Sequence, residues 1–235
     1  MDITCIIARY NEDLAWTLEF PFNQFKYVVY NKGVDTLFEH KNVHMVISLP
    51  NVGRCDHTYL YHIIHNYTKL KTIQVFLPGS VNIVYKKKVA NQMISYILRY
   101  KRAIFIANKV PSIFNEFKHF EIDAYACAYG PNKMLNGEIA TGKCEHRPFG
   151  KWFLHHSFYD SSSYCFNGIF SIDKRDILRH PMDRYIKLER ELAIHSNPEV
   201  GHYIERSWAT IFGPFKYTLL DTKIKNSSIN ILFIP

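Results

Sequence analysis

The sequence predicts an α/β fold in which a central, mostly parallel mixed sheet is flanked by helices on both faces. Short β-branched and apolar runs alternate with amphipathic stretches along the chain, which is the pattern of strands joined by crossover helices. Turn-forming residues, such as Asn31–Gly33 and Pro50–Gly53, separate the runs. Because the 235 residues contain no internal repeat and no low-complexity linker, we expect one domain over residues 1–216 and a tail, 217–235, packed on it.

The predicted strands are runs of β-branched and apolar residues that stop at polar or turn-forming residues. The first covers residues 3–8 and ends before Arg9. Residues 43–49 are compatible with a short strand or an extended loop, and the apolar run at 229–234 with an added strand or a docked arm. The remaining predicted strands cover residues 27–30, 72–77, 103–106 and 166–172.

The predicted helices place apolar residues on one face or begin at a capping residue. Leu60, Ile63 and Ile64 share one face of a helix predicted over residues 54–67. Asp173 is a candidate N-cap for a short helix that ends at Leu178. Further helices are predicted at residues 13–19, 89–100, 182–194 and 199–212.

The segment from 107 to 160 has no clear periodicity. It mixes short apolar runs with turn signals at Gly130–Pro131, Asn136–Gly137 and Pro148. This mixture predicts loops and short elements, and we expect the segment to lie over an active site.

The chain carries a formal net charge of +8, which favours anionic partners such as phosphates, nucleic acid or membrane headgroups. The densest basic runs, Lys86–Lys88 and Arg99–Arg102, are too short for a nucleic-acid-binding tail. Aromatic residues make up 15% of the chain, and their rings serve either a core or a groove that stacks on sugars and bases. A diphosphate site therefore accounts for the charge as well as nucleic acid does.

Three features bear on the compartment in which the protein works. No stretch of 18 apolar residues is present, so no membrane span is expected. The first residues show no secretory signal pattern. The five cysteines are widely separated and include no Cys-x-x-Cys pair, which indicates reduced thiols in a cytosol-like compartment, the host cytoplasm if the protein is viral.

Polar segments follow three of the predicted strands, at Ala8–Asp13, Tyr30–Gly33 and Asn51–His57. Ligands of open α/β sheets bind at the carboxyl ends of strands. Gly53 would allow the backbone to approach a phosphate, and Arg54 offers a guanidinium fork at a helix N-terminus. Taken singly, each segment is also compatible with an ordinary turn or a solvated side chain. Together they indicate a nucleotide diphosphate site, although the glycine motifs of dinucleotide-binding and P-loop proteins are absent.

Several motifs of the chain occur together, in the same order, in one known family. They are Ile7–Asp13, Tyr30–Gly33, Asn51–Arg54 with His57–Leu60, Phe76–Ser80, Phe166–Ile172 with Arg175, Ile177, Arg179 and Pro181, and Glu205–Trp208 with Ile211 and Phe212. These motifs, over residues 3–213, resemble a family of fungal and viral proteins of unknown function. The opening segments are similar to the N-terminal glycosyltransferase domain of a large algal-virus protein that glycosylates the capsid protein.

The resemblance implies a GT-A-like glycosyltransferase that moves a hexose or pentose from a nucleotide diphosphate donor, expected to be a UDP-sugar. The implied acceptor is a glycan or glycoprotein, such as a viral capsid glycan. The residues implied to bind the donor are Ala8, Arg9, Tyr10 and Asn11 at the nucleotide, Asn31 and Lys32 near the ribose or phosphate, and Asn51, Arg54 and His57 along the pocket.

Glu205 is the candidate general base, because an acceptor hydroxyl must lose its proton as it attacks the anomeric carbon. Asp160 and Asp173 are lesser candidates for this role. The alternative interpretation of Glu205 is a salt bridge or a structural hydrogen bond.

GT-A enzymes often hold the donor diphosphate through Mn²⁺ or Mg²⁺ on an Asp-x-Asp motif, which this chain lacks. The corresponding position reads Leu77–Ser80. A divalent metal would then need separated carboxylates, with a histidine such as His202. Alternatively, Arg54, Lys32 and helix dipoles would neutralise the diphosphate without a metal. The pairs His62/His65 and His155/His156 are assigned to packing or the surface.

Two other functions compete with the enzyme. The missing Asp-x-Asp motif favours a nucleotide-sugar-binding protein of the same fold without catalysis. The net charge and the many rings are also compatible with a nucleic-acid-binding protein, which the scattered basic residues make the weaker alternative.

Overall fold

The main sheet has five strands in the order β3-β2-β1-β4-β9. The computed structural model describes residues 1–123, 134–135, 138–139, 142–223 and 230–232. Four strands of this sheet are parallel and the fifth, β9, is antiparallel to β4. The strands are β1 (Ile3–Arg9), β2 (Tyr27–Asn31), β3 (Val43–Ser48), β4 (Ile73–Pro78) and β9 (Phe170–Asp173). The predicted α/β fold with a mostly parallel mixed sheet is therefore confirmed.

Strand β1 lies at the centre of the sheet and separates two hydrophobic clusters. Ile6 and Ala8 point into one cluster, which includes Tyr59 and Trp208. Cys5 and Ile7 point into the other cluster. Because neighbouring strand residues face opposite sides, a strand buried on both faces needs an unbroken apolar run, and this is why residues 5–8 carry no charge.

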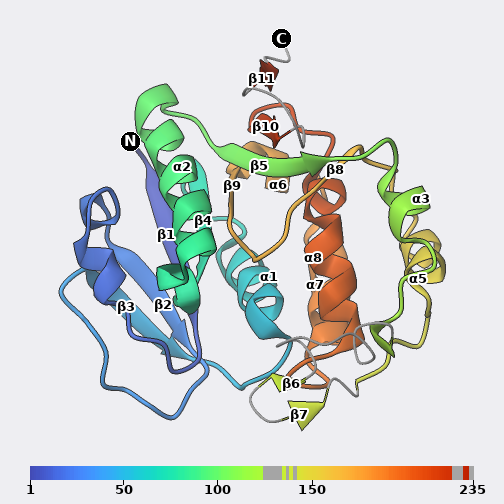
Figure 1. Ribbon diagram of the computed structural model, residues 1–235, viewed down its shortest axis with the longest axis horizontal. Helices are drawn as coiled ribbons and strands as arrows, with labels where there is room; N and C mark the ends of the chain where they lie inside the picture. Colours follow the sequence, from blue (N-terminus) through green and yellow to red (C-terminus); the bar gives the residue numbers. More distant parts are fainter. Residues whose placement is uncertain (124–133, 136–137, 140–141, 224–229, 233–235) are drawn as a thin grey trace.

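Helices cover both faces of the sheet. The first cluster is closed by α1 (Arg54–Asn66), α7 (Met182–Leu192) and α8 (Glu199–Phe212), which stand together to the right of α2 in Figure 1. The second is closed by α2 (Val84–Tyr100) and two 3₁₀ turns, η1 (Ala15–Leu18) and η2 (Phe22–Gln24). The protein is thus an α/β domain of three layers.

A second sheet adjoins β9, in the order β11-β10-β5-β8. Its strands are β5 (Ile104–Lys109), β8 (Ser163–Tyr164), β10 (Leu219–Lys223) and β11 (Asn230–Leu232). The buried Ser171 hydroxyl links the two sheets, since it accepts from the Ile104 N–H and donates to the Ile104 carbonyl. The other elements are η3 (Gly79–Asn82), α3 (Ile113–Phe117), β6 (Met134–Leu135), β7 (Glu138–Ile139), α5 (Phe149–His155) and α6 (Lys174–Ile177).

Most predicted elements are confirmed, and the differences have local causes. Residues 43–48 form a strand rather than a loop. The strand predicted at 166–172 begins only at Phe170, because Asn167 and Gly168 have positive φ angles of 72° and 62° and turn the chain first. Helix α2 begins at Val84, five residues before its predicted start.

Some sequence predictions concern residues that are only partly described. The segment 107–160 contains short elements, as predicted, but its turn signals at Gly130–Pro131 and Asn136–Gly137 lie outside the described residues. Cys5, Cys55, Cys144 and Cys165 are free thiols, and Cys127 is not described. Among the described helices, none has the length and hydropathy needed to cross a bilayer.

A buried carboxylate attaches the segment before β10 to the domain. Asp176 is fully buried, and it accepts hydrogen bonds from the backbone N–H groups of Lys216, Tyr217 and Thr218. Asp173 is the N-cap of α6, as predicted, since its side chain accepts from the Arg175 N–H. The two ends of this short helix therefore have separate polar anchors.

We expect Asp176→Ala to destabilise the protein by at least about 2 kcal/mol, because it leaves buried backbone donors without an acceptor. Asp176→Asn should cost less, since its amide oxygen can still accept. Urea unfolding with an unchanged m-value measures both differences. A midpoint for Asp176→Ala equal to that of the wild type would show that this carboxylate does not anchor the segment.

Candidate functional site

A cavity of about 580 Å³ opens where β1 and β4 end and where α1 and α2 begin. Its walls also include residues of α8. The N-terminal ends of α1 and α2 lie at the lower side of Figure 1, the side to which β1 runs. The cavity therefore occupies the edge at which ligands of open parallel sheets bind.

The structure brings seven of the ten predicted site residues together at this cavity. They are Ala8, Arg9, Tyr10, Lys32, Asn51, Arg54 and Glu205. The other three, Asn11, Asn31 and His57, are not among the residues that line it.

Arg9 contributes its backbone to the cavity, whereas its side chain is fully buried and directed elsewhere. The guanidinium donates to Asn31 Oδ1 at 2.8 Å, to Asp35 Oδ2 at 2.8 Å and to the Glu12 carbonyl at 2.8 Å. It also lies 4.1 Å from the centre of the Phe38 ring. These contacts fix the segments that follow β1 and β2 against each other.

Asn31 and Asn11 also take part in the contacts between the segments that follow β1 and β2. Asn31 Nδ2 donates to the Gly33 carbonyl at 3.0 Å, and Asn11 Oδ1 accepts from the Asp35 N–H at 3.2 Å. Gly33 is required here, because a Cβ at this position would lie 1.5 Å from the Tyr10 carbonyl oxygen. The two asparagines therefore hold the segments that follow β1 and β2 together and do not line the cavity.

His57 faces the neighbouring helix α7. Its Nε2 lies 2.9 Å from Glu189 Oε1. Burial, and secondarily the charge of Lys32, lowers the pKa of His57 to about 4. A neutral His57 thus donates to Glu189 and holds α1 against α7.

Lys32 connects the end of β2 to the start of α1. Its Nζ donates to the Val52 and Arg54 carbonyls, both at 2.5 Å. Burial lowers the pKa of Lys32 to about 8, and the nearby Cys55, Asp56 and Glu189 oppose that shift. The ammonium therefore lies directly beneath the first turn of α1.

The start of α1 has an unusual backbone. Gly53 has a φ of 59°, and a Cβ there would lie 2.6 Å from His57 Cβ and 2.7 Å from Leu192 Cβ. Glycine thus permits the tight turn that places Arg54 at the cavity. Arg54 Nη1 lies 3.4 Å from both ring nitrogens of His202. Burial, followed by the charge of Arg54, lowers the pKa of His202 well below its usual range, so the ring is neutral beside the guanidinium.

Two charged residues of the cavity carried no role in the sequence predictions. Glu12 Oε2 accepts from the Tyr10 N–H at 2.7 Å, and a Cβ on Gly79 would lie 2.6 Å from the same oxygen. The Glu12 carboxylate therefore lies against the end of β4. Lys86, in the first turn of α2, donates to Ser80 Oγ at 2.8 Å. The sequence signal for Lys86 was the basic run 86–88, which lies before the predicted start of the helix at residue 89.

Glu205 reaches the cavity from α8. Its Oε1 accepts from the Asn167 N–H at 2.7 Å, and the positive φ of Asn167 presents that N–H. Structural hydrogen bonding, the alternative considered from the sequence, is thus present, while Glu205 also lines the cavity. The lesser candidates do not line it: Asp160 accepts from the Phe114 N–H, and Asp173 pairs with Arg175.

A second carboxylate lies behind Glu205. Asp56 is buried, and its Oδ1 accepts from Trp208 Nε1 at 2.9 Å. Burial, and then the charge of Glu205, raises the pKa of Asp56 above the usual carboxyl range. The site therefore combines a buried carboxyl with a raised pKa, Asp56, and a second carboxyl, Glu205, that lines the cavity.

The described residues do not fit a protein-held metal. They contain no group of three His, Cys, Asp or Glu side chains arranged to hold an ion. His202, the histidine considered for this role, bonds to Asn197 Oδ1 at 3.1 Å and lies beside Arg54. Three basic side chains, Lys32, Arg54 and Lys86, line the cavity in its described part, and their charge opposes a divalent cation.

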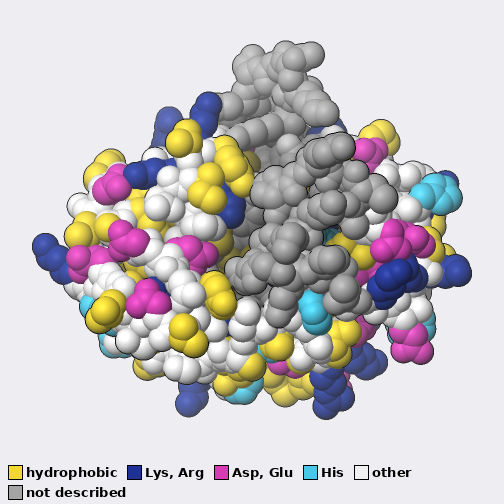
Figure 2. Space-filling model, turned by 60° about the horizontal axis from the view of Figure 1, so that its bottom comes forward, with side chains coloured by type: hydrophobic (Ala, Val, Ile, Leu, Met, Phe, Trp, Pro, Cys, Tyr) yellow, Lys and Arg dark blue, Asp and Glu magenta, His cyan; other side chains and the backbone are white. Residues whose placement is uncertain are grey.

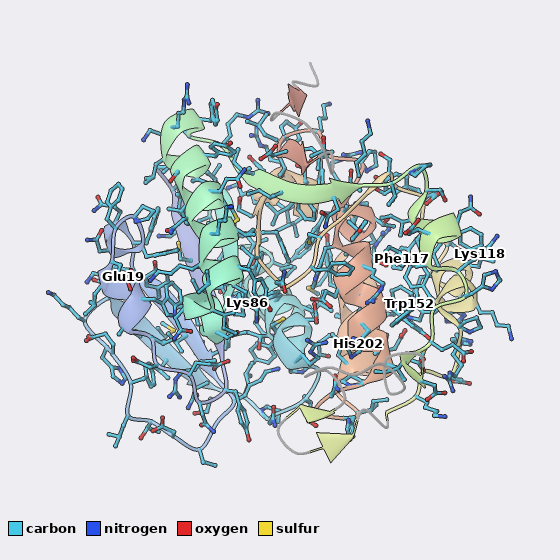
Figure 3. The ribbon with its side chains drawn as sticks, viewed as in Figure 1. Glu19, Lys86, Phe117, Lys118, Trp152 and His202 are labelled. Atoms are coloured by element: carbon cyan, nitrogen blue, oxygen red, sulfur yellow. The ribbon has the colours of Figure 1, made fainter. Side chains whose placement is uncertain are left out.

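Figures 2 and 3 show where charged side chains lie around the site. Figure 3 shows Lys86 on α2 and His202 on α8, on either side of α1. Figure 2 turns the lower side toward the reader, and acidic, basic and apolar side chains are mixed across the described part of that face. The described part of that face shows no continuous basic stripe of the kind that binds nucleic acid.

Comparison of the chain with protein-family models, with curated proteins and with solved structures found no match.

The raised pKa of Asp56 gives a pH-dependent expectation. In the folded state Asp56 binds a proton up to a higher pH than in the unfolded chain, so its stabilising contribution is lost as the pH rises through the raised pKa. Asp56→Asn stays neutral and keeps an acceptor for Trp208. The stability of this variant relative to the wild type should rise between about pH 4 and about pH 8. Urea unfolding across this range measures the difference, and a constant difference would contradict the shift.

Proposed function

We propose that the protein is a GT-A-like glycosyltransferase that uses a nucleotide diphosphate sugar, with a UDP-sugar as the expected donor. The observation that carries the proposal is the cavity at the carboxyl ends of the parallel strands, where Lys32, Arg54 and Lys86 meet Glu205. A diphosphate needs positive charge, and transfer of its sugar to a hydroxyl needs a base. The cavity offers both within about 580 Å³, a volume suited to a nucleotide-sized ligand.

The donor side is supported by the wall that Arg9 fixes. Its guanidinium holds the segments after β1 and β2 in one position, so the backbone of Ala8, Arg9 and Tyr10 forms a preorganised edge. Because this edge is fixed before a ligand arrives, a nucleoside could lie against it at little cost in ordering. The rings of Tyr10, Tyr85 and Phe166 also line the cavity and offer faces for stacking on a base or a sugar.

The transfer step assigns one role to each charged group. Glu205 takes the proton of the acceptor hydroxyl as the oxygen forms its bond to the anomeric carbon. The bond from that carbon to the donor phosphate oxygen breaks, and the nucleoside diphosphate leaves with the electron pair. The cations stabilise the charge that develops on the leaving oxygen. The Asn167 N–H orients one Glu205 oxygen, which leaves the other carboxylate oxygen to accept the proton.

The resemblance and the sheet support the same proposal. A mostly parallel mixed sheet flanked by helices is the core expected of a GT-A-like enzyme. We propose a glycan or glycoprotein acceptor, such as a viral capsid glycan, from the resemblance. The hydrogen bond to Glu205 also favours a second candidate, a nucleotide-sugar-binding protein without turnover, in which this carboxylate only orders the turn before β9.

Nucleotide sugars should raise the melting temperature of the protein, because a ligand that binds only the folded state stabilises it by mass action. The test is a thermal-shift panel of UDP-, GDP- and ADP-sugars, with the free sugars at matched ionic strength as controls. A panel in which no nucleotide or nucleotide sugar shifts the melting temperature would remove the donor site.

Glu205→Gln separates the enzyme from the binding protein. We expect the variant to bind donor normally but to lose donor hydrolysis or transfer by about 10²- to 10⁴-fold, the usual contribution of a general base. Release of nucleoside diphosphate from the donor measures this rate, with water as the acceptor. Glu116→Gln, an exposed substitution on α3, is the matched control. Equal rates for Glu205→Gln and the control would show that Glu205 is not the base, and no turnover in the wild type would favour the binding protein.

A further inference from the structure

The first turn of α2 carries three consecutive lysines, Lys86–Lys88, and no acidic residue. A helix N-terminus bears a partial positive charge, so cations in its first turn are disfavoured unless something nearby compensates them. Lys87 is compensated by Glu19, whose Oε2 lies 2.6 Å from its Nζ. Lys86 instead donates to a neutral hydroxyl, Ser80 Oγ, and lines the cavity. Glu12 and Glu205 offset part of the Lys86 charge from across the cavity, and an anionic ligand would supply further compensation.

A second helix N-terminus faces the same cavity. Arg54 is the first residue of α1, and the carbonyls of that turn are held by the Lys32 ammonium. In the described part of the chain, neither the N-cap of α1, Gly53, nor that of α2, Ile83, forms a side-chain hydrogen bond. In α1 the Arg54 N–H donates to the Ser196 carbonyl at 3.2 Å, and Asp56 lies in the first turn. Both helices are longer than three turns, with 13 and 17 residues, so both have dipoles that favour an anion at these ends.

Lys86 lies beside the segment that follows β4, and this position also bears on its role. It is bonded to Ser80, two residues beyond the end of β4. This is the place where the Asp-x-Asp motif of a metal-dependent donor site was expected. An ammonium group is therefore fixed beside this segment by a hydrogen bond of 2.8 Å.

We propose that Lys86, together with Arg54, Lys32 and the N-terminal ends of α1 and α2, forms a diphosphate-binding site that works without a divalent metal. The inference deepens the proposed function and rests on it for the identity of the nucleotide, but the site itself would bind any diphosphate. Lys86 takes the charge-neutralising role that a metal has in other donor sites and contacts the phosphate that carries the leaving oxygen. Arg54 offers its planar fork to a second phosphate.

The acidic residues of the cavity each have a hydrogen-bond partner in the protein. Glu12 and Glu205 are the carboxylates that line its described part. Glu12 already accepts from the Tyr10 N–H and Glu205 from the Asn167 N–H. A backbone donor thus orients each carboxylate, and the three basic side chains outnumber the two carboxylates that line the described part of the cavity.

The experiment measures binding of inorganic pyrophosphate and of UDP by isothermal titration calorimetry, in EDTA and in Mn²⁺. Lys86→Met removes the ammonium, and Lys88→Met removes the same charge from an exposed position two residues away. We expect both ligands to bind the wild type in EDTA about as tightly as in Mn²⁺. Loss of a charge-assisted hydrogen bond should weaken both ligands by about 10- to 100-fold in Lys86→Met, while Lys88→Met stays close to the wild type.

The outcomes separate the inference from the proposed function. If UDP binds only with Mn²⁺, or if Lys86→Met binds like Lys88→Met, the metal-free site is wrong while the proposed donor remains. If pyrophosphate binds in EDTA and depends on Lys86 but UDP binds no better, the diphosphate site stands and the nucleotide proposal fails. If neither ligand binds under either condition, both are wrong. Circular dichroism of Lys86→Met and Lys88→Met excludes unfolding as the cause of a loss.

Discussion

The burial of Lys32 beneath the first turn of α1 is the contact on which the rest of the site depends. Its ammonium donates to two carbonyls of the turn that contains Gly53 and Arg54. The end of β2 and the start of α1 are therefore fixed relative to each other, and Arg54 is held at the cavity. Burial costs this ammonium solvation, as its lowered pKa of about 8 shows. Two short hydrogen bonds to backbone carbonyls replace the lost contacts with water and offset this cost.

The second constraint is the way in which carboxylates and cations are distributed around the cavity. Asp56 lies behind the wall, bonded to Trp208, and its raised pKa reflects burial and the charge of Glu205. Glu205 and Glu12 face the cavity and are each held by a backbone N–H. Lys32 follows β2, Arg54 begins α1 and Lys86 lies in the first turn of α2, so no single segment of sequence shows that the three meet.

The sequence predicted the sheet well, because burial on both faces requires apolar runs such as Cys5–Ala8 in β1 and Val75–Leu77 in β4. It also located the cavity, since polar residues at the carboxyl ends of parallel strands meet at one edge.

The sequence was less informative about the direction of each side chain. Asn11 and Asn31 lie at the right strand ends, but the buried Arg9 guanidinium recruits Asn31 and its partner Asp35 into a brace. His57 is in the right helix, but its ring contacts Glu189 of α7. Lys86 was missed because α2 begins five residues before the periodicity of its apolar positions becomes clear.

The central claim is that this cavity holds a nucleoside diphosphate with its phosphates between the starts of α1 and α2. A crystal structure of the protein soaked with UDP in the absence of divalent metal tests it most directly. The account predicts phosphate oxygens within hydrogen-bond distance of Lys86 Nζ and the Arg54 guanidinium, with the nucleoside against the edge formed by residues 8–10. A diphosphate bound outside the cavity, or one bridged to the protein by a metal ion after Mn²⁺ is added, would contradict it.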